Sequence, residues 1–380
     1  MRRAAKVFLG LAVFAVELVV ALILCVSVRT FLVLRAQGSL PGDIRIAGAS
    51  PPRLEFACEQ DTGRLESLFS TPEVLSDLKQ IDAAVSLSLS DLSAERAGIV
   101  RRLNDTGIPA TAWMALPSEQ GYYPNSGNEP EAADRFTAFR KWSRENGLRF
   151  ARVGLDIEPG IEDFNLAKAG RWGHLARTLL GRCFEGGSVT RARAAYAALI
   201  GRMERDGDPV ETYQFPFIAD ERKVRSTVLE RLFGIVDVRG DREVLMIYTS
   251  FNQAMDSATI WQYGPDAPAI AVGSTAGDPA TDRKFRPLDW DEFSRDLIVA
   301  SHFSRVVGVY SLEGCVQQGF LSRLAAMDWG RSVTIPAEAN SKAIHLRARI
   351  QSVLWTASRI LYLLAALVLF DAWLIWRVAR

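Results

Sequence analysis

The sequence has few of the residues that most metal and nucleophilic sites require. It contains three histidines and four cysteines in 380 residues. His174, His302 and His345 are scattered, with no H-E-x-x-H spacing, so a zinc hydrolase is not expected. No G-x-S-x-G, P-loop or G-x-G-x-x-G sequence follows a candidate strand. The chain therefore lacks the motif that usually positions a catalytic serine and the glycine-rich loops that usually bind nucleotides. We therefore expect neither a bound metal nor a cofactor.

The chain also lacks a charge excess. Its formal net charge is +1 at pH 7, and no basic stripe is interleaved with aromatic residues, so nucleic acid is not an expected partner. Internal repeats and low-complexity segments are absent as well.

Two long apolar runs are present, one near each end of the sequence. Residues 7–28 contain one charge, Glu17, and residues 352–376 end in a tryptophan-rich stretch. Each is long enough to cross a hydrocarbon core of about 30 Å. A cleaved signal peptide is the alternative for the first run, but that run is longer than a usual signal and no small-x-small site follows closely. We predict an N-terminal anchor within 1–35 and a C-terminal transmembrane helix at 352–376.

The basic residues around these runs predict the orientation. They precede the first span and follow the second: Arg2, Arg3 and Lys6, then Arg377 and Arg380. The positive-inside bias places both termini in the cytoplasm. The protein is then a two-pass protein of the cytoplasmic (inner) membrane with its middle on the periplasmic side. It contacts the lipid bilayer and has access to membrane-protein partners. Arg29 and Arg35, on the far flank of the first span, run against this orientation.

Between the spans, short apolar runs alternate with amphipathic helical stretches. This alternation is typical of parallel α/β proteins. Eight strands and roughly 300 residues favour a (β/α)8 TIM barrel over 45–335, followed by a helical connector at 336–351. The run 234–238 is interpreted as an edge extension before the sixth strand. The eight predicted strands are 53–58, 82–88, 109–116, 150–157, 211–217, 243–249, 268–273 and 305–311.

The most informative stretch is the fourth strand, which ends in Asp156 and Glu158. Side chains alternate faces along a strand, so these two acids emerge on the same face. Closely spaced carboxyl groups cannot all ionise freely, and this keeps one of them protonated near neutral pH. A protonated acid beside an ionised one is the pair that cleaves glycosidic bonds. We predict Glu158 and Asp156 as the catalytic pair.

Other residues with suitable chemistry fall at or near the carboxyl ends of the predicted strands, where barrel enzymes place their sites. They form an acidic, aromatic and amide-rich set without histidine, which suits sugar rings and hydroxyl groups. The predicted substrate-binding residues are Glu59, Trp113, Gln214, Tyr248 and Glu313. Cys58 and Cys315 fall at the ends of the adjacent first and eighth strands, and either a disulfide or two buried thiols fits that placement.

At these residues the chain resembles the chitinase-like family of barrel glycosidases. That family carries D-x-x-D-x-D-x-E on its fourth strand, and Asp156 and Glu158 match its last two positions, whereas Ala151 and Gly154 occupy the first two. The run 246–248 matches the start of the family's M-x-Y-D sequence, with Thr249 in place of the acid. This resemblance implies Glu158 as the general acid and Tyr248 as a contact for a substrate acetamido group.

A second resemblance is to the fungal-type lysozymes, which are peptidoglycan muramidases. Their L-D-x-E strand is similar to 155–158, and their I-Y-T-S segment is similar to 247–250. Both resemblances imply a glycosidase that acts on a polysaccharide containing N-acetylated sugars. Together with the two predicted spans, they predict a membrane-anchored enzyme that acts on an envelope or extracellular polysaccharide. The alternative is a catalytically inactive barrel that binds a glycan or an envelope protein. A purely structural scaffold is the third interpretation.

Overall fold

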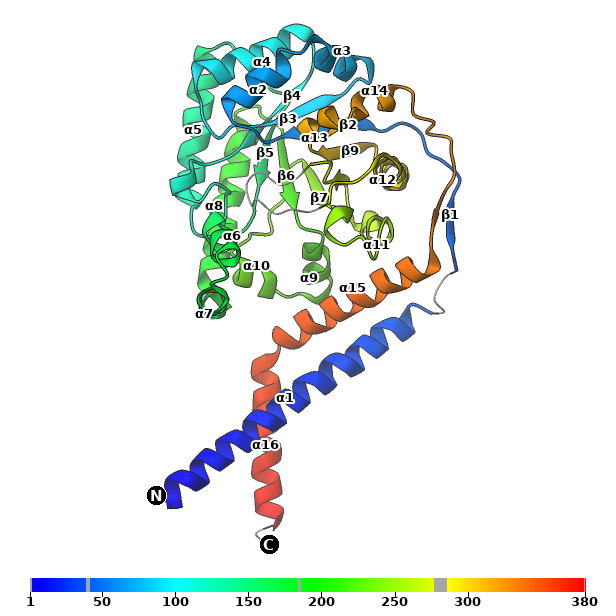
Figure 1. The fold of residues 1–380 in the computed structure, drawn as a ribbon. Helices are drawn as coiled ribbons and strands as arrows, with labels where there is room; N and C mark the ends of the chain where they lie inside the picture. The colour runs from blue at the N-terminus through cyan, green and yellow to red at the C-terminus, as the bar shows by residue number, and fades with distance from the viewer. Residues whose placement is uncertain (1, 39–41, 184–185, 277–285, 379) are drawn as a thin grey trace.

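The fold was examined in a computed structural model that describes residues 2–38, 42–183, 186–276, 286–378 and 380. Eight parallel strands close into a barrel, each paired with its neighbours along the chain (Figure 1). All eight predicted strands are present, so the predicted (β/α)8 architecture is confirmed. The barrel strands are β2 (Arg53–Cys58), β3 (Ala84–Ser88), β4 (Ala110–Met114), β5 (Arg152–Asp156), β6 (Val210–Gln214), β7 (Arg242–Met246), β8 (Ala269–Gly273) and β9 (Val306–Tyr310).

Helices surround the barrel and cover the outward faces of its strands. Residues 161–183 form two helices, separated near Gly170, which has a φ of 67°. Residues 217–233 also form two helices, separated at Arg225, whose φ is 53°. The helices of this layer are α2 (Thr62–Phe69), α3 (Pro72–Gln80), α4 (Ala94–Thr106), α5 (Glu129–Glu145), α6 (Ile161–Lys168), α7 (Trp172–Cys183), α8 (Gly186–Arg205), α9 (Phe217–Val224), α10 (Val228–Phe233), α11 (Ala258–Tyr263), α12 (Trp290–Phe303), α13 (Leu312–Gln317) and α14 (Phe320–Ala325).

The prediction that 234–238 extends a strand is wrong. These residues form no strand, because β6 and β7 pair directly with each other. Ile235 and Val236 are buried in the main apolar core, and Gln214 Nε2 donates to the carbonyl of Val236 at 3.0 Å. The apolar character of this run therefore reflects burial in the helix layer, which periodicity alone does not separate from a strand.

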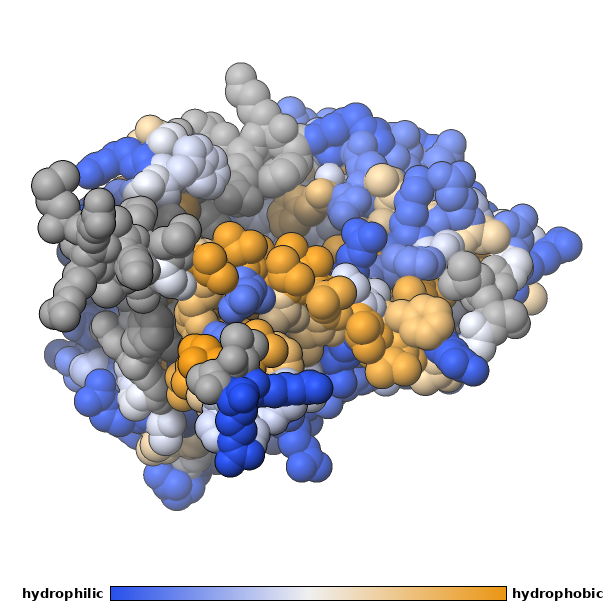
Figure 2. Space-filling view, turned by 90° about the horizontal axis from the view of Figure 1, so that it is seen from below, coloured by the Kyte–Doolittle hydropathy of each residue, from blue (hydrophilic) through white to orange (hydrophobic). Residues whose placement is uncertain are grey.

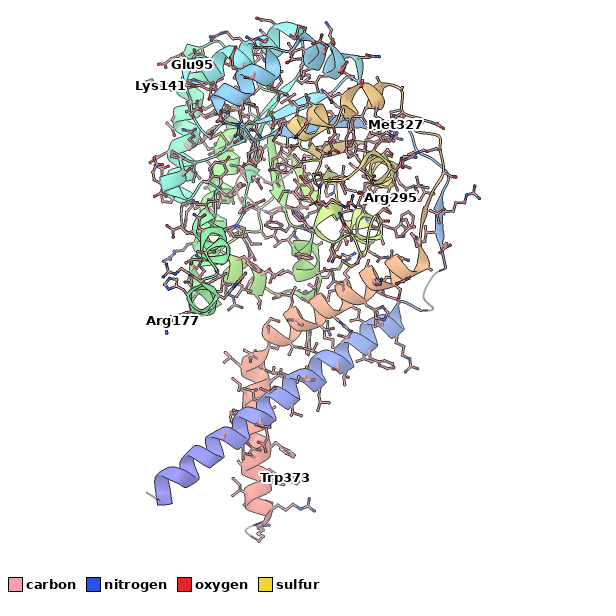
Figure 3. All side chains as sticks on the ribbon, in the orientation of Figure 1. Glu95, Lys141, Arg177, Arg295, Met327 and Trp373 are labelled. Atoms are coloured by element: carbon pink, nitrogen blue, oxygen red, sulfur yellow. The ribbon has the colours of Figure 1, made fainter. Side chains whose placement is uncertain are left out.

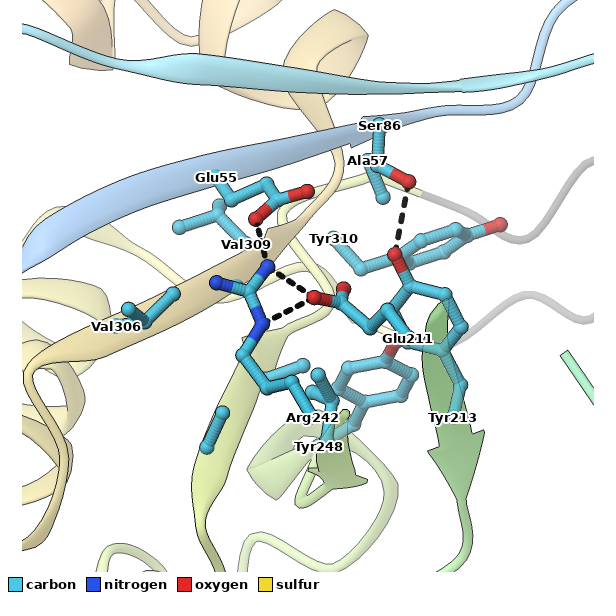
Figure 4. Close-up of a pocket in the computed structure, with 14 residues that line it drawn as sticks. Glu55, Ala57, Ser86, Glu211, Tyr213, Arg242, Tyr248, Val306, Val309 and Tyr310 are labelled. Atoms are coloured by element: carbon cyan, nitrogen blue, oxygen red, sulfur yellow. Dashed lines mark hydrogen bonds and ion pairs between the residues drawn. The ribbon is translucent and has the colours of Figure 1, made fainter. Parts of the chain in front are cut away.

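Alternate residues along each strand divide between two environments. Leu54 and Phe56 of β2 and Val153 and Leu155 of β5 belong to the main apolar core, which also takes in helix residues outside the barrel. The inward side chains are small, polar or charged over much of the barrel interior. They enclose a cavity of about 30 Å³ (Figure 4), about the space that one water molecule needs.

Three charged side chains meet inside the barrel. Arg242 of β7 forms ion pairs with both Glu55 of β2 and Glu211 of β6, and Thr111 of β4 donates to Glu55 at 2.6 Å. Burial, followed by the charge of Glu55, raises the pKa of Glu211 above its ordinary value. Four strands are thus linked through one polar cluster in the lumen, and Figure 4 shows the ion pairs of Arg242 with Glu55 and Glu211.

Both ends of the barrel domain are joined to long helices. Strand β1 (Ile44–Ile46) pairs antiparallel with β10 (Val333–Ile335), so the entering and leaving segments lie side by side. Helix α1 (Arg2–Ala36) precedes this pair and α15 (Ala337–Ala357) follows it. Helix α15 contacts α1, α9 and α11, and α16 (Ile360–Val378) continues away from the barrel (Figure 1).

A buried ion pair fixes α15 to the barrel. Arg347 Nε donates to Asp220 Oδ1 at 2.7 Å, and Gln351 Nε2 donates to the same oxygen at 2.8 Å. The neighbouring acids Asp220 and Glu221 have different roles. Glu221 accepts from the backbone N–H groups of Leu229 and Glu230 at the start of α10. Asp220 instead connects the barrel to α15.

Within the described ranges, two helices are long and apolar enough to cross a membrane. The apolar windows are Ala12–Ala36, with a mean hydropathy of 2.4, and Ile360–Arg377, with a mean hydropathy of 1.8; neither is buried by the rest of the protein. Seen from below, a band of hydrophobic side chains crosses the face between hydrophilic surfaces (Figure 2). Trp373 lies on α16, far from the barrel (Figure 3). The predicted run 352–376 is divided between α15 and α16, since its first residues complete α15.

Replacing Gly154 by alanine is expected to destabilise the barrel. A Cβ at this position would lie 2.9 Å from Tyr213 Cε2 inside the lumen, and overpacking of this kind costs about 1–3 kcal/mol. Thermal unfolding of the full chain in detergent measures the effect. The matched control is Gly98→Ala on α4, where a Cβ would meet nothing within 4 Å. An unchanged or raised unfolding temperature for Gly154→Ala would contradict this packing.

Candidate functional site

The candidate site is the mouth at the carboxyl ends of the barrel strands. Glu59 follows β2, Trp113 lies in β4, Asp156 ends β5, and Tyr310 ends β9. Because the eight strands are parallel, all of these positions lie at the same end of the barrel. Trp113, Tyr123 and Tyr310 pack into one buried cluster, against which Tyr122 and Tyr248 also pack. The mouth is therefore acidic and aromatic.

Glu59 lies at the centre of this mouth, where two tyrosines hold it. Tyr123 Oη donates to Glu59 Oε1 at 3.1 Å, and Tyr310 Oη donates to Glu59 Oε2 at 2.8 Å. The Glu59 side chain is 5% exposed. Burial and then the charge of Glu59 raise the pKa of Tyr123 well above its ordinary value. This tyrosine therefore stays protonated and remains a donor to the carboxylate.

Asp156 is the buried member of the predicted catalytic pair. It is 3% exposed, and its Oδ1 has no hydrogen-bond partner among the described residues. Burial, followed by the negative charge of Glu59, raises the pKa of Asp156 well above its ordinary value. Burial thus favours the protonated form of Asp156, whereas the resemblance assigns the role of proton donor to Glu158.

Glu158 lies further out and is half-buried. Its backbone N–H donates to the carbonyl of Pro124 at 3.2 Å, so the loop after β4 and the segment after β5 are joined at this point. The charge of Glu158 also contributes to the raised pKa of Tyr123, which places both Glu59 and Glu158 near that phenol. The mouth thus brings Glu59, Asp156 and Glu158 together around Tyr123.

Aromatic rings form the wall of the mouth. Tyr248 stacks on Tyr310, with ring centroids 5.5 Å apart and planes at 24°. Tyr122 meets Tyr123 edge to face at 4.8 Å. Trp113 is buried, and its Nε1 has no hydrogen-bond partner among the described residues. Such rings offer flat faces and polar edges, the combination with which proteins hold amphipathic ligands.

Two predicted binding residues lie apart from this cluster. Gln214 is buried, and its Nε2 bonds to Val236 O outside the lumen. Its neighbour Tyr213 lines the lumen cavity, so strand alternation turns Gln214 towards the helix layer. Glu313 accepts from Gln60 Nε2 at 3.1 Å and lines a separate cleft of about 790 Å³. The structure brings together Glu59, Trp113, Asp156, Glu158 and Tyr248.

Sequence reasoning missed Tyr122, Tyr123 and Tyr310 as members of the site. Tyr310 ends β9 and was visible as an aromatic at a strand end. Tyr122 and Tyr123 belong to the long loop after β4, which the sequence analysis did not assign to the site. The available signal was two adjacent tyrosines in an otherwise polar loop near the carboxyl end of a strand.

Three positions lack the acid of the chitinase-like pattern, and the structure explains two of them, Gly154 and Thr249. At Gly154 the ring of Tyr213 occupies the space that a side chain would need. Thr249, which replaces the acid of M-x-Y-D, donates through Oγ1 to Asp296 of α12. Burial raises the pKa of Asp296 to about 6. At Gly154 there is therefore no room for the family's acid, and at Thr249 a hydroxyl group that pairs with Asp296 takes its place.

The cysteines form no disulfide between Cys58 and Cys315. Cys58 and Cys315 are free and buried, so of the two alternatives the structure has the two buried thiols. Burial and then the charge of Glu313 raise the pKa of the Cys58 thiol. In the part of the chain that the structure describes, no group of three or more His, Cys, Asp or Glu residues could hold a metal ion.

The raised pKa of Asp156 predicts a pH-dependent stability. The stabilising contribution of the neutral carboxyl is fully present below about pH 3.9, the unfolded value, and is lost as the pH rises through the raised folded-state pKa. Asn cannot ionise, so the unfolding temperature of Asp156→Asn minus that of wild type should increase from pH 5 to pH 9. Glu162→Gln, an exposed position on α6, is the control. If the unfolding temperatures of wild type and Asp156→Asn change with pH in parallel, the raised pKa of Asp156 is contradicted.

Comparison with known proteins gives structural matches alone, since no family profile and no curated protein sequence matches the chain. The glycoside hydrolase domain of PgaB (BpsB) from Bordetella bronchiseptica is similar at 12% identity and a TM-score of 0.42, over 73% of this chain and 98% of that one. A family 1 β-glucosidase from Thermotoga maritima is similar at 13% identity and a TM-score of 0.40, over 70% of this chain and 90% of that one. A D-allulose 3-epimerase from Methylomonas sp. is similar at 9% identity and a TM-score of 0.38, over 80% of this chain and all of that one. At these scores the matches carry no argument about function, and barrels host many chemistries, so function is argued from the mouth itself.

Proposed function

We propose that this chain is a membrane-anchored glycoside hydrolase that acts on an envelope or extracellular polysaccharide containing N-acetylated sugars. The observation that carries the proposal is the mouth itself. Tyr123 and Tyr310 donate hydrogen bonds to Glu59, the charges of Glu59 and Glu158 both act on Tyr123, and Asp156 is buried near Glu59 with a raised pKa. Several carboxyl groups in one aromatic mouth suit cleavage of a glycosidic bond, which uses a pair of carboxyl groups that flank the bond.

Glu158 is proposed as the general acid that protonates the leaving oxygen. It is the more exposed of the two β5 acids and therefore the one that a sugar in the mouth can reach. Asp156, buried beneath it with a raised pKa, is proposed to orient the substrate acetamido group if the sugar supplies its own nucleophile. Electrostatic support of Glu158, the other role considered from sequence, requires an ionised Asp156. Tyr248 is proposed to hold that acetamido group, and Trp113 to shape the subsite. Glu313 is a candidate for more distant sugar units through its separate cleft.

The location is proposed from the two apolar helices and their flanking charges. Windows of 25 and 18 residues are long enough to cross a bilayer, and the basic residues at both ends of the chain favour cytoplasmic termini. The barrel is then periplasmic, held near the outer surface of the cytoplasmic membrane by α15. This position suits action on envelope glycans and contact with other membrane proteins.

A barrel that binds a glycan or an envelope partner without cutting it is the second candidate. Two observations favour it. Gly154 stands where the resembled family has an acid, and the ring of Tyr213 lies against it. Thr249 replaces a second acid of that family and bonds to Asp296. This candidate shares the proposed mouth and differs in the role of Glu158.

Replacing Glu158 by glutamine separates the two candidates. If Glu158 is the acid, turnover by the detergent-solubilised full chain should fall by about 10²–10⁴-fold, because glutamine cannot donate the proton. The measurement is release of reducing sugar from peptidoglycan and from oligomers of N-acetylglucosamine, with binding of the same oligomers measured alongside. The matched control is Glu162→Gln on α6, an exposed acid four positions away.

Three outcomes are distinguishable. Equal hydrolysis by wild type and Glu158→Gln would contradict the assigned acid. Oligomer binding by both proteins without product release would favour the binding candidate over the hydrolase. Absence of both binding and release would contradict a glycan function for the mouth.

A further inference from the structure

Two arginines from different helices converge on one tryptophan where α1 passes the end of α15. The Cζ of Arg29 on α1 lies 4.4 Å from the ring centroid of Trp355. The Cζ of Arg359, just after α15, lies 4.6 Å from the same ring. Thr356 and Cys25 are in contact at 3.6 Å beside them, which confirms that the two helices touch here. One indole thus holds two positive charges close together.

Neither arginine forms an ion pair with a carboxylate within the described residues. Arg359 Nη1 donates to the carbonyl of Trp355 at 3.3 Å and to Ser358 Oγ at 2.9 Å, both uncharged acceptors. Arg29 Nε is buried and has no hydrogen-bond partner among those residues. Arg347 on the same α15 differs, because it pairs with Asp220 and Asp266. Two adjacent guanidinium groups without a counter-charge form an incomplete site that an anion would complete.

The position of the cluster suggests which anion completes it. Arg29 lies in the part of the apolar window of α1 nearer the barrel, and Arg359 immediately precedes the window of α16. In the proposed topology both lie at the membrane surface that faces the barrel. Arginine binds phosphate through paired N–H groups while its planar face stacks on an aromatic ring. Basic pockets between membrane helices hold anionic lipid headgroups.

We propose that Arg29, Trp355 and Arg359 form a binding site for the phosphate of an anionic phospholipid in the leaflet facing the barrel. This inference rests on the proposed membrane insertion and is independent of what the barrel mouth does. The proposal explains why Arg29 lies on the predicted periplasmic flank of the first span, where the positive-inside bias does not favour a basic residue. The sequence offers no other explanation for this position. The bound phosphate supplies the counter-charge that the protein lacks and joins α1 to the junction of α15 and α16.

Lipid-dependent thermal stability of the purified full chain tests the proposal. In neutral detergent, phosphatidylglycerol should raise the unfolding temperature, whereas phosphatidylcholine with the same acyl chains and soluble glycerol phosphate should not. Arg29→Gln and Arg359→Gln should each reduce the phosphatidylglycerol shift at least twofold. The matched control, Arg349→Gln at an exposed position on α15, should keep the full shift. Native mass spectrometry of the same proteins counts the bound lipids. It gives a second measurement of lipid binding for any variant that is too unstable for thermal unfolding.

Several results would overturn the lipid site. These are an equal shift with phosphatidylcholine, an equal shift with glycerol phosphate, or an undiminished shift and lipid count in both arginine variants. Oligosaccharide hydrolysis and binding are measured on the same preparations, so failure of the glycan function is seen separately. Extraction of the wild-type chain from membranes by alkaline carbonate would instead contradict the membrane insertion on which the site rests.

Discussion

The barrel depends on one shared cation inside its lumen. Arg242 pairs with Glu55 and Glu211, which come from three different strands, and Thr111 completes the polar contacts of Glu55. Removing one partner of a buried ion pair leaves an uncompensated charge, so the three charges are bound to one another as a unit. Most barrels fill this space with branched apolar side chains. Here the polar interior is continuous with the mouth, since Tyr248 and Tyr310 line the same small cavity.

Much of the fold was predictable, because apolar strands and amphipathic helices alternate clearly along the chain. The common face predicted for Asp156 and Glu158 assumed a strand that reaches both residues, whereas β5 ends at Asp156 and Glu158 lies in the segment that follows. The placement of Gln214 was not predictable, because the sequence does not show which of two alternating faces points inwards until Glu211 and Tyr213 are seen in the lumen. Tyr122 and Tyr123 were missed because a loop conformation brings them to Glu59, and no periodic pattern encodes a loop. The ion pair of Arg347 with Asp220 joins residues 127 positions apart, a distance over which a single sequence carries no pairing signal.

Helix α15 connects the barrel to the two apolar helices. This helix is fixed to the barrel by Arg347 and Gln351 through Asp220 of α9, and it packs along α1 before the chain continues into α16. Helix α9 directly follows β6 at the mouth end of the barrel. The contact between α15 and α9 therefore fixes the mouth relative to the apolar helices. In the proposed topology, this places the acids and aromatic rings at a set orientation above the membrane surface.

The central claim is that the mouth around Glu59, Asp156 and Glu158 binds a sugar. An experimental structure of Glu158→Gln with a saturating oligomer of N-acetylglucosamine tests it most directly. The account predicts a sugar ring in contact with Tyr248 and a glycosidic oxygen within hydrogen-bond distance of the side chain at position 158. A mouth without sugar at saturation, or an oligomer bound elsewhere on the barrel, would contradict the claim.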